Sequence, residues 1–346
     1  MSEDLYETDY EVGQSNLQKW GMDIHHPVFW VSSGLVILFV AGVLFAPEAA
    51  KGVFDGAKWW SINTFDWLFM AGANIFVLFC LALIVLPVGR IRLGGEDAKP
   101  DFSMMSWFAM LFAAGMGIGL MFWAVAEPTA YYTGWFETPL GVTANTPEAA
   151  NLAMSATMFH WGMHPWAIYA VVALSLAFFS YNKGLPLTIR SAFYPLIQDR
   201  CWGPIGHVID TVAVLATLFG LATSLGFGAQ QAAAGLAYLF DFEAGINTQI
   251  AVIVVVTAIA LFSVLRGLDG GVKILSNVNM GIAALLLLFV LVVGPTAVIF
   301  ATMGSTLIGY LGEIVSYSSW VGREDEAWMH GWTVFYWAWW ISWSAA

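Results

Sequence analysis

The stretch SWFAMLFAAGMGIGLMFWAVAEP (106–128) carries no charged side chain between Ser106 and Ala126. Its apolar residues do not alternate with polar ones, as they would in a strand with one face in water. A helix of about 20 apolar residues is long enough to cross the hydrocarbon core of a bilayer. The stretch therefore predicts a transmembrane helix.

The composition indicates that such runs recur along the chain. Hydrophobic residues make up 59% of it and charged residues 10%, whereas a soluble domain has about 45–50% apolar residues. The mean hydropathy is +0.74. Backbone polar groups in lipid must pair within the protein, which leaves helices or a closed barrel, and long runs without alternation select helices. We expect an all-α integral membrane protein in a lipid bilayer, without a nucleic-acid partner.

Hydropathy predicts eight spans. The fourth and fifth are longer than a bilayer requires, so they must tilt or project from it. Two further segments, 49–60 and 306–320, are expected to lie in the interface, the second being too polar to cross. The spans are expected at 27–46, 65–87, 104–126, 148–180, 207–239, 247–265, 275–301 and 328–346.

Basic residues gather in alternate connections between these spans. The third and fifth connections, 127–147 and 240–246, hold none. The positive-inside rule then places the even connections and the N-terminus in the cytoplasm. The first 24 residues are acidic and lack the features of a signal peptide, so with the net charge of −12 they are interpreted as a solvated cytosolic tail. The basic residues of the even connections are Arg90, Arg92, Lys99, Lys183, Arg190, Arg200, Arg266 and Lys273.

The chain stops at WISWSAA (340–346), which is still apolar. A span that begins near Trp328 covers about 28 Å by Ala346 at 1.5 Å per residue, barely one hydrocarbon thickness. We therefore expect the chain to be truncated.

Three glycines at alternate positions lie in the middle of the opening stretch: Gly115, Gly117 and Gly119. Each lowers helix stability by about 1 kcal/mol relative to alanine. Gly115 and Gly119 fit a close helix contact, which is one interpretation, but Gly117 lies on another face. The triplet favours an unwound segment at membrane depth, where freed carbonyls bind a cation and freed N–H groups bind an anion.

Aromatic rings are concentrated in two segments, TMFHWGMHPWAIY (157–169) and WTVFYWAWWISW (332–343). In the first, Pro165 is expected to bend the helix between Trp161 and Trp166. The second is either an interfacial belt or a binding face. Its rings extend over about 16 Å along the helix axis, whereas an interfacial belt is confined to a short depth of the membrane. Converging rings suit a quaternary ammonium, which has no N–H to donate and binds through ring quadrupoles. The rings at helical spacing in the second segment are Tyr336, Trp340 and Trp343, with Trp339 beside them.

His160 and His164 stand four residues apart and could ligate a metal with Glu127, but a catalytic zinc normally takes three well-placed ligands. We interpret them as buried, hydrogen-bonded histidines and predict neither a metal site nor an enzyme. The fifth span is rich in small and hydroxyl residues, which indicates helix packing or an ion site. Its candidate ion ligands are Thr217, Thr223 and Ser224.

The segments FAAGMGIGLMFWAVAEP (112–128), MFHWGMHPWAIYA (158–170) and GWTVFYWAWWISWS (331–344) resemble the betaine/choline/carnitine transporter family, over about residues 26 to 344. The resemblance implies a leucine-transporter-like, inverted-repeat fold in a bacterial-type inner membrane, with about eight of twelve helices present, and often a homotrimer. The implied parts are the acidic tail (1–26), two additional helices (27–103), the first five-helix repeat (104–302), an extracellular interfacial segment (303–327) and the first helix of the second repeat, cut short (328–346).

The resemblance also implies residue roles. It places an aromatic box between the fourth and eighth spans, a glycine stretch along the substrate path, and a sodium site that uses the carbonyls of Ala113 and Met116 with Thr217. The implied box residues are Trp161, Trp166, Tyr169, Trp339, Trp340 and Trp343, and the implied stretch is Gly115, Met116, Gly117 and Gly119.

The chain departs from the family pattern at two places. Sodium-coupled betaine carriers have a second threonine four residues after the first in the fifth span, where this chain has Leu221. They also continue the eighth span as Ser-Pro-Phe, where this chain has Ser344, Ala345 and Ala346. Choline-type members often carry an acid at the third glycine, so Gly119 favours a zwitterion such as glycine betaine.

Together these features predict sodium-coupled symport of a quaternary-ammonium or zwitterionic compatible solute by alternating access, with sodium as coupling ion and no cofactor. The alternatives are a sodium-independent exchanger for choline or carnitine-type solutes, a solute receptor that does not transport, and, less favoured, a membrane enzyme.

Overall fold

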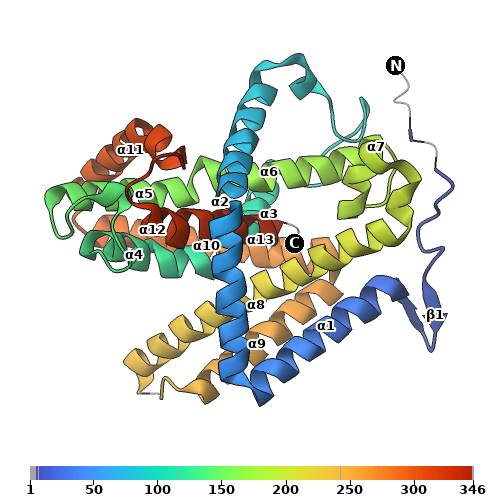
Figure 1. The fold of residues 1–346 in the computed structure, drawn as a ribbon, viewed down its shortest axis with the longest axis horizontal. Helices are drawn as coiled ribbons and strands as arrows, with labels where there is room; N and C mark the ends of the chain where they lie inside the picture. Colours follow the sequence, from blue (N-terminus) through green and yellow to red (C-terminus); the bar gives the residue numbers. More distant parts are fainter. Residues whose placement is uncertain (1–4, 7, 116, 242, 345–346) are drawn as a thin grey trace. The chain divides into compact units, whose positions relative to one another are not determined.

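The fold is that of a computed structural model, which describes residues 5–6, 8–115, 117–241 and 243–344, and leaves the side chains of residues 114, 115, 118 and 343 undescribed. Helices make up most of these residues (Figure 1). A short antiparallel hairpin, β1 (Leu17–Lys19) with β2 (Met22–Ile24), lies in the N-terminal segment and departs from the all-α expectation.

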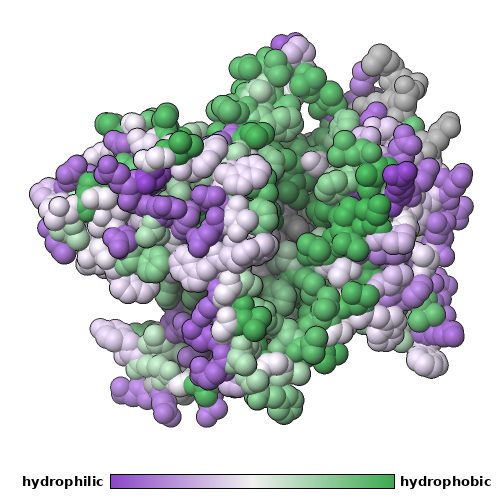
Figure 2. Space-filling model, viewed as in Figure 1, coloured by the Kyte–Doolittle hydropathy of each residue, from purple (hydrophilic) through white to green (hydrophobic). Residues whose placement is uncertain are grey.

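Among the described residues, seven helical stretches are long and apolar enough to cross a membrane. Most of their large apolar side chains are exposed, and hydrophobic residues cover much of the face seen in Figure 2. Lipid is the solvent that such a surface requires. The stretches are α1 (His26–Phe45), α2 (Pro47–Val85), α5 to η3 (Pro147–Asn182), α8 (Pro204–Phe240), α9 (Ile246–Leu265), η6 with α10 (Leu268–Val293) and α11 (Thr296–Ser318).

The third and eighth expected spans are not among the seven. The third is divided into α3 (Met104–Gly115) and α4 (Ile118–Thr133). The eighth is made of three short elements: α12 (Glu326–Trp328), the π-helix η7 (Met329–Val334) and α13 (Phe335–Ser344).

Helix α2 joins the expected interfacial segment 49–60 to the second span. It has 39 residues and is therefore about 58 Å long, roughly twice the hydrocarbon thickness. Phe65 departs from helical geometry (φ −117°, ψ 16°) and marks a kink where the span was expected to begin. The segment before Phe65 is thus a continuation of the helix.

The seventh span was expected to run to residue 301, but α10 ends at Val293. Gly294 is extended (φ −80°, ψ −179°), as the residue before a proline tends to be, and Pro295 has no N–H with which to continue the helix. Residues 296–301 therefore belong to α11, and the polar segment 306–320 is largely the second half of that helix.

The chain folds as two compact units. The first contains residues 1–98, 160–220 and 318–346, and the second contains residues 99–159 and 221–317. Within the first unit, α2 packs against α6 (Met163–Ala177), and α13 packs against both. Within the second unit, α3 packs against α10.

The N-terminal tail differs from the solvated segment expected. The Tyr10 ring stacks on the Trp202 ring at 4.4 Å and 10°. Trp202 Nε1 donates a hydrogen bond to Thr8 Oγ1 at 2.9 Å, and the Tyr6 ring packs on that of Tyr194 at 5.1 Å. These aromatic contacts hold the described part of the tail against the connection that precedes α8.

Candidate substrate site

The helix that carries the first aromatic segment is interrupted at Gly162. Helix α5 (Pro147–Trp161) ends before it and α6 begins after it, and Gly162 itself is non-helical (φ −93°, ψ −131°). Pro165 cannot donate to the carbonyl of Trp161 and its ring crowds that carbonyl, which explains a break one turn earlier. The expected bend between Trp161 and Trp166 is confirmed.

This break places Trp161 and Tyr169 on either side of Trp340. The Trp161 and Trp340 ring centroids are 5.2 Å apart at an interplanar angle of 88°. The Tyr169 and Trp340 rings are 5.5 Å apart at 70°. Trp340 of α13 therefore meets, edge to face, rings from both α5 and α6. Trp166 lies at the margin, 6.0 Å from Tyr169 and 37% exposed.

The rings continue along α13 towards its first residue. Trp339 stacks on Trp340 at 5.8 Å and 28°, and on Phe335 at 6.4 Å and 29°. Tyr336 is buried and lies 5.9 Å from Trp161. The side chain of Trp343 lies outside the described part, so its place in the box stays a prediction. Five of the six predicted box residues, all but Trp343, thus belong to one connected group of rings in the first unit.

Trp340 Nε1 and Tyr169 Oη belong to this group, and neither has a hydrogen-bond partner among the described residues. Both atoms are buried. Trp340 is only 6% exposed. An unpaired buried donor lowers stability by about 1–3 kcal/mol, so a ligand that accepts hydrogen bonds would relieve it. A carboxylate is such an acceptor.

The two histidines of this segment are hydrogen-bonded and stacked on rings. His160 Nε2 lies 2.9 Å from Thr333 Oγ1, and the His160 ring is 4.8 Å from that of Tyr336. His164 Nε2 lies 3.1 Å from Asn74 Oδ1, and the His164 ring stacks on Trp337 at 5.3 Å and 14°. These contacts match the interpretation as buried, bonded histidines. Within the part of the chain that the structure describes, no group of three or more His, Cys, Asp or Glu side chains could hold a metal.

In the second unit, the glycine stretch interrupts a helix as expected. Helix α3 ends at Gly115, α4 begins at Ile118, and Gly117 between them is non-helical (φ −104°, ψ −140°). The break is narrower than predicted, because Gly119 belongs to α4. The first N–H groups of α4 and the last carbonyls of α3 have no partner along the helix, so they are available to an anion and a cation.

The predicted sodium ligands stay a prediction. Ala113 lies in α3 of the second unit, Met116 lies outside the described residues, and Thr217 lies in α8 of the first unit. Thr217 lines a cavity of about 550 Å³ together with Ser32, Thr188 and Asp210.

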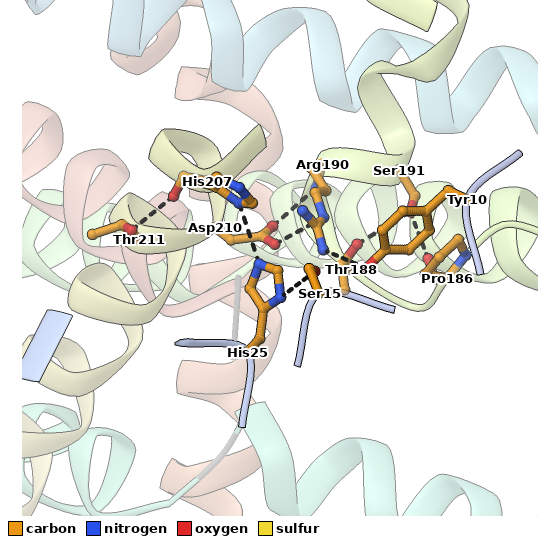
Figure 3. A network of polar contacts seen from close by, with 10 residues as sticks. All are labelled: Tyr10, Ser15, His25, Pro186, Thr188, Arg190, Ser191, His207, Asp210 and Thr211. Atoms are coloured by element: carbon orange, nitrogen blue, oxygen red, sulfur yellow. Dashed lines mark hydrogen bonds and ion pairs between the residues drawn. The ribbon is translucent and has the colours of Figure 1, made fainter. Parts of the chain in front are cut away.

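The tail and α8 share a polar network that the sequence did not predict. Arg190 is 3% exposed; its Nε lies 3.0 Å from Asp210 Oδ2, and its Nη2 donates to Tyr10 Oη at 3.3 Å. His25 Nε2 lies 3.2 Å from His207 Nδ1. Figure 3 shows these side chains converging from the tail, the connection and the start of α8. Arg190 had been counted only as a cytoplasmic charge, although Asp210 inside an apolar span is a sequence signal for a basic partner.

Burial depresses the pKa of His25 below its ordinary value of 6.5, and the positive charge of Arg190 acts in the same direction, followed by His207 and His26. The neutral imidazole is therefore the form that fits this network.

The sequence matches the model of BCCT, the betaine/carnitine/choline family transporter, over residues 27–346. Glycine betaine transporter 1 of Vibrio parahaemolyticus is 64% identical over 97% of this chain and 64% of its own length. A glycine betaine/proline/choline/ectoine transporter of the same organism is 58% identical over 97% of this chain and 60% of its own length. The high-affinity choline transport protein of Escherichia coli is 40% identical over 93% of this chain and 47% of its own length.

The chain thus spans less than two thirds of the length of these curated relatives. Its matched residues include both aromatic segments and the glycine stretch. The family is one of transporters, so the alternative of a membrane enzyme is excluded. This chain is a member of BCCT, the betaine/carnitine/choline family of transporters.

Proposed function

We propose that the full-length protein carries a quaternary-ammonium or zwitterionic compatible solute, glycine betaine foremost, across a bacterial inner membrane, with its N-terminus in the cytoplasm. The observation that carries this proposal is the edge-to-face meeting of Trp340 with Trp161 and Tyr169. Ring faces in a buried setting attract an ammonium by about 2 kcal/mol or more. The names of the relatives, which include glycine betaine and choline transporters, support the same class of solute.

In this proposal the two ends of the solute contact different groups of the first unit. The trimethylammonium lies against the indole faces, and the carboxylate accepts hydrogen bonds from the buried Trp340 Nε1 and Tyr169 Oη. A choline molecule offers only a hydroxyl to these donors. The pair of unpaired donors therefore supports a zwitterion over a simple cation.

The proposed transport is sodium-coupled symport by alternating access between two inverted repeats. Ala113, Met116 and Thr217 contribute to the sodium site in this proposal, and the helix break at Gly117 supplies carbonyls at membrane depth. An inside-negative potential favours sodium entry by about 2.3 kcal/mol per charge per 100 mV. A homotrimer is the proposed assembly.

The test is uptake of labelled glycine betaine by the full-length protein in proteoliposomes. We expect uptake that requires an inward sodium gradient and that collapses in Trp340→Leu. Uptake without sodium dependence would refute the proposed sodium coupling, and unchanged uptake in Trp340→Leu would refute the proposed role of the aromatic box. The tryptophan fluorescence of the reconstituted variant reports whether binding itself is lost.

Sodium-independent exchange is the second candidate, because the fifth span has Leu221 where sodium-coupled relatives were expected to have threonine. Exchange predicts that internal solute stimulates uptake and that sodium has no effect. A receptor predicts fluorescence changes on adding betaine with no uptake at all. These three outcomes separate the candidates in one set of vesicles.

A further inference from the structure

Lys58 lies over the ring that begins α13. Its Nζ is 4.8 Å from the centroid of Phe335 and 5.1 Å from that of Trp59. Both Lys58 and Phe335 belong to the first unit. An ammonium within about 6 Å of a ring centroid is attracted by the ring quadrupole. The lysine side chain thus places a cation on a face that a quaternary ammonium would also occupy.

Phe335 is the first ring of the series that leads to the box. It stacks on Trp339, which stacks on Trp340, which meets Trp161 and Tyr169. These rings form one connected series from the first residue of α13 to the box. Lys58 stands at its beginning, at the N-terminal end of α13.

Lys58 forms no ion pair with a carboxylate of the described residues, although its charge acts on Asp55, one turn earlier, so Lys51, Asp55 and Lys58 together carry one net positive charge. Lys51, two helical turns earlier on α2, pairs instead with Asp55. Lys58 is exposed in the segment before the kink at Phe65, so its ammonium can pair with a carboxylate that is not part of the protein. The carboxylate of a zwitterion can draw the Lys58 ammonium away from the ring, while the quaternary ammonium of the same molecule takes its place on Phe335. A cation such as choline meets the same ring but is repelled by Lys58.

We propose that Lys58, acting with Phe335, is a specificity-determining residue that favours zwitterionic over cationic quaternary-ammonium solutes before they reach the aromatic box. This inference rests on the proposed function and deepens it, because it assigns the choice of substrate class to a residue outside the box. The Lys58 charge acts through attraction of the carboxylate and repulsion of a net cation.

The test compares glycine betaine and choline in the full-length protein in proteoliposomes. The variants are Lys58→Gln, which removes the charge, Lys58→Arg, which keeps it, and the matched control Lys51→Gln/Asp55→Asn, which removes the neighbouring ion pair as a whole and leaves no unpaired carboxylate beside Lys58. An exposed charge pair changes an equilibrium by up to about fivefold. We expect Lys58→Gln to lower the ratio of kcat/KM for betaine to that for choline by about three- to fivefold, while Lys58→Arg and Lys51→Gln/Asp55→Asn leave it unchanged.

Salt provides a second readout. The Debye length falls from about 10 Å at 0.1 M to about 3 Å at 1 M ionic strength. In wild type the preference for betaine should therefore decrease when potassium chloride replaces sucrose at matched osmolality, whereas in Lys58→Gln it should not. Dissociation constants from tryptophan fluorescence give the same ratio independently of transport.

An unchanged ratio in Lys58→Gln, or an equal change in Lys51→Gln/Asp55→Asn, would overturn the assignment while leaving the proposed function intact. Wild-type protein that neither binds nor carries betaine would overturn both. Loss of uptake in Trp340→Leu together with an unchanged preference in Lys58→Gln would place all discrimination within the box and refute the role of Lys58.

Discussion

The ring of Trp161 meets the ring of Trp340 at 88°, with the centroids 5.2 Å apart. Edge-to-face pairs of this kind are favourable because the positive edge of one ring contacts the negative face of the other. Residues 161 and 340 lie far apart in the sequence, and the break at Gly162 ends α5 directly after Trp161. A right-angled pair presents two differently oriented ring surfaces to one ligand, which a parallel stack does not.

Removal of the shared ring should weaken solute binding. Trp340→Leu in the full-length protein loses a cation–π contact worth about 2 kcal/mol, which corresponds to roughly thirtyfold in the dissociation constant for glycine betaine. Tryptophan fluorescence titration measures this constant. Trp30→Leu, at an exposed position of α1, is the control and should change it less than twofold. Equal effects of the two substitutions would show that hydrophobic bulk, and not the box, determines affinity.

Straightening the third span should stop transport without unfolding the protein. Gly117 has a negative φ, and apart from its chain neighbours no atom of the described residues lies within 4 Å of the position that an added Cβ would take, so the methyl group of Gly117→Ala has room there. Alanine favours helix by about 1 kcal/mol over glycine, which shifts the segment towards a continuous helix. We expect uptake to fall at least severalfold while the melting temperature is maintained or rises.

Gly34→Ala is the control for that substitution, because Gly34 lies inside α1 and also has open space around it. It should leave uptake unchanged. Full activity of Gly117→Ala would mean that the break between α3 and α4 has no part in transport.

The buried ion pair of Arg190 and Asp210 should contribute strongly to stability. Their side chains are 4% and 14% exposed, so Arg190→Gln leaves a carboxylate without its counter-ion in a poorly solvated place. Breaking a buried pair in this way typically lowers stability by about 3–5 kcal/mol. The double variant Arg190→Gln/Asp210→Asn should lose less than the sum of the single losses, which thermal unfolding in detergent can measure.

The exposed pair of Lys51 and Asp55 is the matched comparison, with side chains 72% and 53% exposed. Lys51→Gln should lower stability by less than about 1 kcal/mol. Additive losses at Arg190 and Asp210 would contradict a direct interaction between them.

The sequence predicted the parts of the fold that depend on composition and local chemistry. Long apolar runs identified most of the spans, and the glycines and Pro165 identified both helix breaks, because these residues act on their own backbone. The aromatic box was predicted through helical spacing and family resemblance. The rings of Trp161 and Tyr169 contact that of Trp340 in the first unit, and their role as a substrate box stays a prediction.

Other features depended on contacts between distant segments and could not be predicted. The acidic tail was interpreted as solvated because charge dominates its composition, yet Tyr10 stacks on Trp202, 192 positions later in the sequence. Arg190 was counted only as a basic residue that indicates a cytoplasmic connection, although its partner Asp210 lies in α8, the helix that follows this connection. The end of α10 at Val293 was missed because hydropathy outweighed the Gly294–Pro295 pair.

Docking of the tail should weaken in acid. Both ring nitrogens of His25 form hydrogen bonds, Nδ1 with Ser15 Oγ at 3.1 Å and Nε2 with His207 Nδ1 at 3.2 Å. When the tail is docked, burial and the nearby charge of Arg190 lower the pKa of His25. Above pH 6.5, His25 is mainly neutral in docked and undocked tails alike, and docking is at full strength. As the pH falls through 6.5, the undocked tail binds the proton first, so the docking free energy decreases until the pH is below the docked pKa. Hydrogen exchange of residues 8–24, corrected for intrinsic rates, should therefore show less protection at pH 5.5 than at pH 7.5.

His25→Gln should reduce this pH dependence, whereas His26→Gln at the exposed neighbouring position should retain it. Equal pH dependence in wild type and His25→Gln would assign the effect to another group, because glutamine cannot take up the proton on which this argument depends.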